Sequence, residues 1–212
     1  MKTLKKLTAM VLALAMIIAM SVSSFAVNIT TSDTVTVKFT YNYSNNMDDV
    51  YTWYDNEINS GDLFTTNSTV QVNLSTLNGY DLSTLKGKYN LPDGHAMSST
   101  ISVLDVVLAA ALSTNHTVTC SWDNDPEEGA PGGYLYNIDN RTLAFEYGLN
   151  DNGTYWLSGE GFVIGTDTTA VAANANPAFS DTYLSNVAIT TFPVGTVIYV
   201  DLGTYFFSEV NM

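Results

Sequence analysis

The segment SSTISVLDVVLAAALSTN, residues 98 to 115, decides the fold class, because no other segment after residue 26 has a comparable helical pattern. Ser102 precedes the apolar run and Asp105 follows three residues later, which is the spacing of a capping box at a helix N-terminus. Apolar residues then recur at intervals of three and four, as on one side of an α-helix: Val103, Leu104, Val107, Leu108, Ala111 and Leu112. We therefore predict a helix over about 102–113.

Almost all of the remaining chain predicts β-strands. TVTVKFTY (34–41) alternates strictly, with Val35, Val37 and Phe39 on one side and threonines and Lys38 on the other. Further strands are predicted at 50–55, 69–74, 117–122, 134–138, 143–149, 154–165, 184–190 and 196–202. One helix among many strands indicates the α+β class.

The first 26 residues predict a secretory signal peptide rather than part of the fold. Lys2, Lys5 and Lys6 precede the apolar run VLALAMIIAM, and Ser24 and Ala26 stand where a signal peptidase requires small residues. This pattern is typical of a Gram-positive bacterial protein that is secreted, with possible retention at the cell surface. No second apolar run follows, so we expect no membrane insertion after cleavage. No segment resembles a disordered linker, so we expect one domain over 27–212.

The balance of charge excludes one class of function. The chain holds seven Lys and Arg against 21 Asp and Glu, and three of the seven lie in the predicted signal peptide. The few remaining cations are scattered and cannot form a patch that follows phosphates, so nucleic acid is excluded as a partner. Cys120 is the only cysteine, so no disulfide can form within the chain, and its place in TVTCSW predicts a buried thiol.

The order of these elements resembles a β-grasp, a mixed sheet with one helix packed on its apolar face. The chain also resembles a bacterial surface-domain family, largely without assigned function, that is similar to the C-terminal domain of transcobalamin. The segments that carry the resemblance are TVTVKFTY, TISVLDVVLAAAL (100–112), GGYLYNIDN (132–140), TYWLSG (154–159) and PVGTVIYVDL (193–202). The resemblance implies a β-grasp-like domain with an insertion at about 47–88, and the family name suggests cobalamin as a minor option for the ligand.

Within this insertion the chain contains a short duplication, LSTLNGY followed by LSTLKGKY, over residues 74–89. Two copies of so short a unit cannot form a solenoid. We interpret them as a local duplication at the surface, with Asn78-Gly79 as a turn.

An acidic loop, DNDPEEGAPGG (123–133), follows the strand predicted at 117–122, and its acidic part is 123–128. Its carboxylates supply oxygen ligands of the kind that calcium prefers, although the order of residues differs from that of an EF-hand. The candidate ligands are Asp123, Asp125, Glu127 and Glu128. The alternative is a solvated acidic turn.

Aromatic residues are the main candidates for ligand binding, because flat rings beside hydroxyl and carboxylate groups stack on sugars or anchor protein interfaces. Two groups lie near the strands: Tyr51, Trp53 and Tyr54 in the first, and Tyr134, Tyr136 and Trp156 in the second. The alternative is that about half of each group packs in the core.

Signals for catalysis are few. Glu146 and Glu160 could form the carboxylate pair of a glycosidase. Ser83-x-x-Lys86 matches a motif of penicillin-recognising hydrolases, but the companion motifs S-D-N and K-T-G are missing. His95 and His116 lack the partners of a metal site and are interpreted as loop residues.

We therefore expect a secreted or cell-surface binding or adhesion module without enzymatic activity, whose ligand is a glycan or a surface protein. The alternative is a structural subunit of an exported assembly, in which aromatic strands associate copies of the chain. A carbohydrate hydrolase is the third hypothesis.

Overall fold

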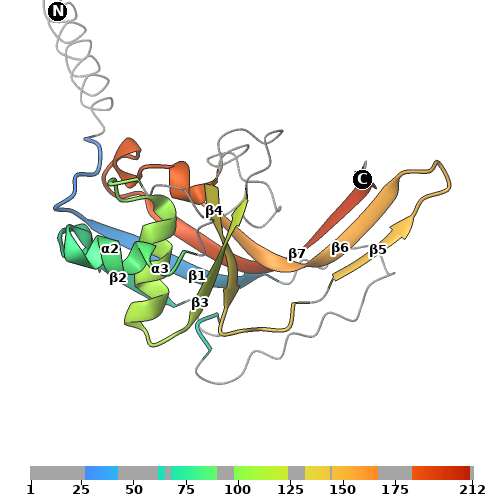
Figure 1. Cartoon of the computed structure of the whole chain (residues 1–212), viewed down its shortest axis with the longest axis horizontal. Helices are drawn as coiled ribbons and strands as arrows, with labels where there is room; N and C mark the ends of the chain where they lie inside the picture. The colour runs from blue at the N-terminus through green and yellow to red at the C-terminus, as the bar shows by residue number, and fades with distance from the viewer. Residues whose placement is uncertain are drawn as a thin grey trace, which may run out of the picture.

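The computed structural model describes residues 27–42, 62–64, 68–89, 98–123, 132–143, 145–166 and 183–210 (Figure 1). The strands are β1 (Thr34–Asn42), β2 (Thr69–Asn73), β3 (Val118–Asp123), β4 (Gly132–Ile138), β5 (Phe145–Leu149), β6 (Tyr155–Gly165) and β7 (Val197–Val210). The helices are α2 (Tyr80–Lys86) and α3 (Val103–Ser113), with 3-10 turns η1 (Leu74–Leu77), η2 (Leu184–Asn186) and η3 (Ile189–Thr191). The fold is strand-rich and of the α+β class, as predicted.

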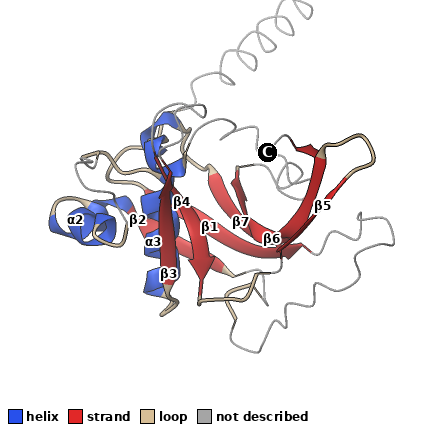
Figure 2. Ribbon diagram, turned by 45° about the vertical axis from the view of Figure 1, so that its right-hand side comes forward, coloured by secondary structure: helices blue, strands red, loops and turns tan. Residues whose placement is uncertain are grey.

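Five strands form the main sheet in the order β2-β1-β7-β6-β5, and β3 pairs with β4 in a separate hairpin (Figure 2). The central pair β1–β7 is parallel, and the pairs β1–β2, β6–β7 and β5–β6 are antiparallel. The alternation predicted for β1 is confirmed, because Val35, Val37 and Phe39 are all buried.

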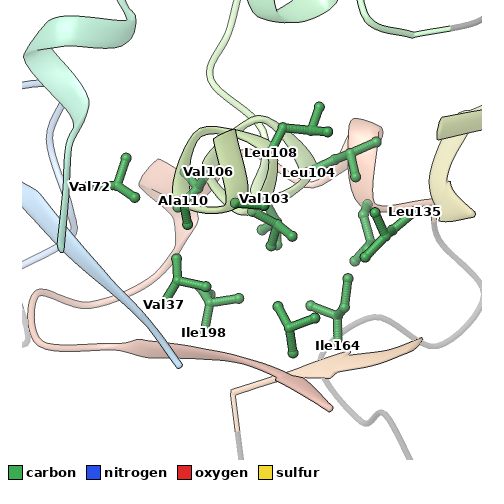
Figure 3. Packing of buried hydrophobic residues seen from close by; sticks show 14 of the residues in the cluster. Val37, Val72, Val103, Leu104, Val106, Leu108, Ala110, Leu135, Ile164 and Ile198 are labelled. Carbon is green, nitrogen blue, oxygen red and sulfur yellow. The ribbon is translucent and has the colours of Figure 1, made fainter. Parts of the chain in front are cut away.

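Helix α3 lies over the sheet and forms the centre of the core (Figure 3). Its capping box is confirmed: the Asp105 amide donates to Ser102 Oγ at 3.1 Å, and the Ser102 amide donates to Asp105 Oδ2 at 2.7 Å. More than one side of the helix is buried, since Val106 and Ala110 are as inaccessible as the predicted Val103 and Leu104. The helix is buried on several sides because the sheet, the β3–β4 hairpin and α2 all contact it.

The strand predicted at 184–190 is wrong, because this segment forms the turns η2 and η3. Its backbone pairs with the start of α3 instead of with the sheet. The Val103 amide donates to the Val187 carbonyl at 2.9 Å, and the Ile189 amide donates to the Ile101 carbonyl at 3.0 Å. The segment thus satisfies an N–H group of the first helical turn that has no partner within the helix.

The duplicated segment is not only a surface feature, which corrects the sequence interpretation. The first copy forms η1 and the second forms α2, and both bury their leucines against the core: Leu74, Leu77, Leu82 and Leu85. The predicted turn at Asn78-Gly79 is confirmed, with a φ of 68° at Gly79. Helix α2 was not predicted, since it is only seven residues long.

The other strand predictions within the described residues are confirmed, although β7 continues to Val210, beyond the expected end at 202. The strand predicted at 50–55 and the signal peptide at 1–26 lie outside the described residues. Cys120 is buried, as expected. Of the helices that the structure describes, none has the length and apolar character needed to span a membrane.

Candidate functional site

The β5–β6 hairpin extends beyond the region that α3 covers, together with the end of β7 (Figure 1). The turn that joins its strands sets their register. The Asn150 amide donates to the Thr154 carbonyl at 2.7 Å, and Gly153 has a φ of 84°, a conformation that glycine adopts without strain. Asn152 Oδ1 accepts hydrogen bonds from the amide and the hydroxyl of Thr154, which holds the turn closed.

Trp156 lies on this hairpin, directly opposite Gly148. A Cβ atom at residue 148 would lie only 2.6 Å from the indole ring, so the ring rests on the glycine backbone. Any larger residue at 148 would displace it. The local sequence thereby positions a half-buried indole ring across the hairpin.

Two carboxylates share this face of the hairpin with Trp156. Glu146 pairs in register with Ser158 and is half-buried. Glu160 follows two residues later on the same side of β6 and is only 8% exposed. Diagonal positions of this kind in an antiparallel pair are about 7–8 Å apart between Cα atoms. We call the set Trp156, Gly148, Glu146 and Glu160 the Trp156 face.

The Trp156 face continues directly into the core. The next side chain of β6 on this side is Phe162, whose ring centroid lies 5.8 Å from that of Phe64. The Arg141 guanidinium lies 5.2 Å from the centroid of Phe64 and forms an ion pair with Asp62. The inner end of the face is therefore held by packed rings and a largely buried ion pair.

The aromatic candidates of the β3–β4 hairpin occupy a separate position. Tyr134 stacks on Tyr183, with ring centroids 6.4 Å apart and an interplanar angle of 28°. Gly132 allows this, because a Cβ there would lie 2.3 Å from the Tyr183 side chain. Tyr136 is 56% exposed and stands at an irregularity of the strand pairing. Tyr134 is thus half-buried and packs against Tyr183, whereas Tyr136 faces solvent.

The structure does not describe the side chains of the remaining predicted site residues. Tyr51, Trp53 and Tyr54 lie outside the described residues, as do Asp125, Glu127 and Glu128 of the acidic loop. Asp123 ends β3, and its side chain is not described. In the described ranges no group of three or more His, Cys, Asp and Glu side chains could hold a metal ion. Calcium binding by the acidic loop therefore stays a prediction.

Lys86 belongs to the S-x-x-K match found in the sequence. Its ammonium group contacts other residues of the fold. It lies 3.3 Å from Asp105 Oδ2 and donates to the Thr100 carbonyl at 3.1 Å. Tyr89 also donates a hydrogen bond to Asp105, and burial, followed by the Asp105 charge, raises the pKa of this tyrosine. A pocket of about 500 Å³ adjoins this cluster, lined by Gly79, Leu82, Ser83, Lys86, Ser98 and Ser99.

Two further predictions concern single residues. Burial raises the pKa of the Cys120 thiol to about 12, which favours the protonated thiol over the nucleophilic thiolate at neutral pH. His116 is a loop residue, as expected, and its Nδ1 lies 2.6 Å from Asp139 Oδ2. His95 lies outside the described residues.

Comparison of this chain with models of protein families, with curated proteins and with solved structures finds no match.

Three members of the Trp156 face were predicted from the sequence, under different hypotheses, and Gly148 was not among them. Trp156 was an aromatic candidate, whereas Glu146 and Glu160 were weighed as a catalytic pair. The signal that links them is the turn NDNGT (150–154), which fixes which residues of β5 and β6 stand opposite one another. Counting outward from this turn places Gly148 against Trp156.

Proposed function

We propose that this chain is an exported, non-enzymatic binding module that binds a glycan on the Trp156 face. The observation that supports the proposal is the indole ring resting on Gly148, with the half-buried Glu146 on the same side of the hairpin. An aromatic ring supplies a flat apolar surface for one side of a sugar, and carboxylates accept hydrogen bonds from its hydroxyl groups. The strong net negative charge favours an uncharged glycan over an acidic one.

We also propose a more specific fold than the α+β class. We take the chain as a β-grasp-like domain, related to the surface domains similar to the C-terminal domain of transcobalamin. This is supported by one long helix that packs on a mixed sheet with a parallel central pair. Cobalamin stays a minor option, since no described feature provides a recognisable corrinoid site.

The first experiment measures binding of the 27–212 protein to bacterial cell walls and to a panel of insoluble polysaccharides, by depletion from solution. We expect saturable depletion on one material and at least a tenfold weaker affinity for Trp156→Ala, a loss of about 1.4 kcal/mol or more. The matched control is Tyr80→Ala, which removes an aromatic ring that is 83% exposed on α2 and should leave binding unchanged. Absence of depletion on every material would reject the glycan proposal.

The same assay separates binding from hydrolysis and tests the acidic loop. The hydrolase hypothesis requires release of soluble sugars that is abolished by Glu146→Gln or Glu160→Gln, because a glycosidase needs both carboxyl groups. We expect no release by the unmodified protein. Depletion that is lost in EDTA and restored by calcium would instead assign the loop at 123–128 to the binding site.

A further inference from the structure

A pocket with a volume of about 500 Å³ lies between helix α2 and the residues that lead into α3. Its size falls within the range of about 300–1,000 Å³ that is usual for the binding sites of small molecules. The residues that α2 contributes recur at intervals of three and four, so they lie on one side of the helix. We call this site the α2 pocket, and it is lined by Gly79, Leu82, Ser83, Lys86, Ser98 and Ser99.

Lys86 is the charged residue of this lining, and it is only 5% exposed. Its ammonium group donates to the Thr100 carbonyl at 3.1 Å and lies 3.3 Å from Asp105 Oδ2. An ammonium group carries three N–H donors, and no third acceptor contacts it in the part of the chain that the structure describes. The centroid of the Tyr89 ring is 6.0 Å away, which is beyond hydrogen-bond distance. An oxygen atom of a ligand in the pocket can therefore accept the third N–H, whose burial without a partner is otherwise costly.

Two serine hydroxyls add further polar groups to the lining. Ser83 and Ser99 are exposed, and neither hydroxyl forms a hydrogen bond within the described ranges. Ser98 differs from them, because its hydroxyl bonds to the Thr100 hydroxyl at 2.6 Å. A hydroxyl group both donates and accepts hydrogen bonds. The α2 pocket therefore offers an N–H donor and two hydroxyls that can pair with the hydroxyl groups of a ligand.

The charges at the α2 pocket favour an uncharged ligand. The Asp105 carboxylate balances the Lys86 ammonium, so this buried pair is neutral as a whole. An anion would gain little from an ammonium that is already paired, and a chain with 21 acidic and seven basic residues would repel it. A cation in the pocket would instead lie against the ammonium group, which repels it at short range.

The lining also selects among uncharged molecules. Leu82 is buried and supplies an apolar surface beside the hydroxyls. A flat aromatic ligand binds best among apolar and aromatic side chains, whereas the described lining has one leucine and no aromatic residue. A sugar ring carries several hydroxyl groups around a small apolar surface of C–H groups. The mixture of hydroxyls, one N–H donor and one leucine matches a sugar better than an aromatic ring.

We propose that the α2 pocket binds one unit of a neutral sugar, with an oxygen atom that accepts from Lys86 and hydroxyls that bond to Ser83 and Ser99. Figures 1 and 2 show α2 and the β5–β6 hairpin at opposite ends of the molecule, so this site is separate from the Trp156 face. It therefore does not depend on glycan binding by that face. An open pocket with few hydrogen bonds is expected to have a dissociation constant on the order of 1 mM.

NMR titration of the isotope-labelled 27–212 protein tests the pocket with glucose, galactose, mannose and N-acetylglucosamine. We expect at least one of these sugars to shift the backbone amide signals of Ser83 and Ser99 saturably at concentrations below about 50 mM. Glucuronate, which carries a carboxylate, should bind at least tenfold more weakly than the best of them. Absence of saturable shifts with every neutral sugar would overturn the proposal. A difference of less than tenfold for glucuronate would overturn the assignment to neutral sugars.

A matched pair of variants on α2 locates the bound sugar. Ser83→Leu removes a hydroxyl of the lining and fills part of the pocket, so it should weaken binding at least tenfold. Thr84→Leu is the control, because residue 84 is also exposed on α2 but is not part of the lining. The control should leave binding unchanged, and circular dichroism checks the fold of both variants. Equal effects of the two substitutions would show that the sugar does not occupy this pocket.

The variant Trp156→Ala separates the two proposed sites. It should weaken depletion onto polysaccharides and leave the sugar-induced shifts of Ser83 and Ser99 unchanged. Loss of these shifts in Trp156→Ala would place the sugar on the Trp156 face and overturn the α2 pocket. Depletion that persists although no neutral sugar shifts Ser83 and Ser99 would reject the pocket alone and leave the Trp156 face supported.

Discussion

The part of the sheet beneath α3 and the hairpin beyond it differ although β6 runs through both. Toward one end, the inward side of β6 carries Ile164 and Phe162, which pack in the core or against it. Toward the other end the same side carries Glu160 and Trp156. Burial continues from the apolar residues to Glu160, which is 8% exposed, whereas Trp156 is only half-buried. The part of this face that can contact a ligand therefore begins at Trp156.

The two regions also differ in how tightly their residues are enclosed. Beneath the helix, Val37 and Ile198 are fully buried (Figure 3). Val200 is fully buried as well. On the hairpin, Tyr147 and Leu149 are more than half exposed. Substitutions in the first region should therefore change the free energy of unfolding, and substitutions in the second should change binding.

The largest effect is expected for Asp105→Ala, at the start of α3. The substitution removes the side-chain partner of the capping box and leaves the Lys86 ammonium buried without its counter-ion. Breaking one side of a buried ion pair costs about 3–5 kcal/mol. Urea unfolding followed by circular dichroism measures this loss. A loss below about 1 kcal/mol would contradict the structural role of the cluster.

A pair of leucine substitutions then compares the two regions directly. Leu104 is fully buried on α3, and Leu104→Ala should lower the free energy of unfolding by about 2–5 kcal/mol. Leu149 is exposed on β5, and Leu149→Ala should change it by less than about 0.5 kcal/mol. Urea unfolding of the two variants at low protein concentration is the measurement. Similar losses would mean that the hairpin is part of the core.

A carboxylate in the centre of the sheet gives a prediction about pH. Burial raises the pKa of Asp201 to about 6, although the Thr40 hydroxyl, which donates to it at 2.6 Å, lowers it in part. Because this pKa lies above the value of 3.8 for the unfolded chain, the folded protein binds the proton more tightly. The contribution of Asp201 to stability therefore falls by roughly 2–3 kcal/mol as the pH rises from about 4 to 6.

The variant Asp201→Asn isolates this contribution from those of the other carboxylates. The difference in unfolding free energy between the variant and the unmodified protein should become more favourable to the variant as the pH rises through that range. Unfolding curves at several pH values measure it. A difference that stays constant from pH 4 to 7 would show that Asp201 titrates normally.

A smaller loss than those at Asp105 and Leu104 is expected from a substitution that tests how Gly148 supports the Trp156 ring. In Gly148→Ala the new Cβ would lie 2.6 Å from the indole, so the ring must move. We expect a loss of about 1–3 kcal/mol in stability and a changed tryptophan fluorescence spectrum. Gly153→Ala, in the adjacent turn where nothing lies near the Cβ, strains only the backbone and should leave the spectrum unchanged. Identical spectra for Gly148→Ala and the unmodified protein would contradict the contact.

Much of the fold follows from local patterns in the sequence. The capping box and the apolar repeat predict α3, and alternation predicts the strands that flank it. The segment 184–190 has similar apolar spacing but forms turns, because its backbone bonds to the residues that begin α3. Hydrophobic pattern alone cannot show which distant backbone groups a segment will satisfy.

The candidate site depends on pairing, which single-residue patterns do not reveal. Trp156 was identified from its residue type, but its position on Gly148 depends on the register of β5 against β6. The turn at 150–154 determines that register, but the register was not predicted from it. Helix α2 was missed for a different reason, since two leucines on a helix of seven residues give too short a repeat to distinguish it from a turn.

The central parallel pair has a consequence for how the molecule folds. It joins β1 to β7, and the hydrogen bond from Thr40 to Asp201 spans 161 residues of sequence. Contacts of such long separation form late, because the entropy of closing the loop must be overcome before they contribute. A growing chain therefore cannot complete its sheet until β7 has been synthesised. Until then β1 lacks its parallel neighbour at the centre of the sheet.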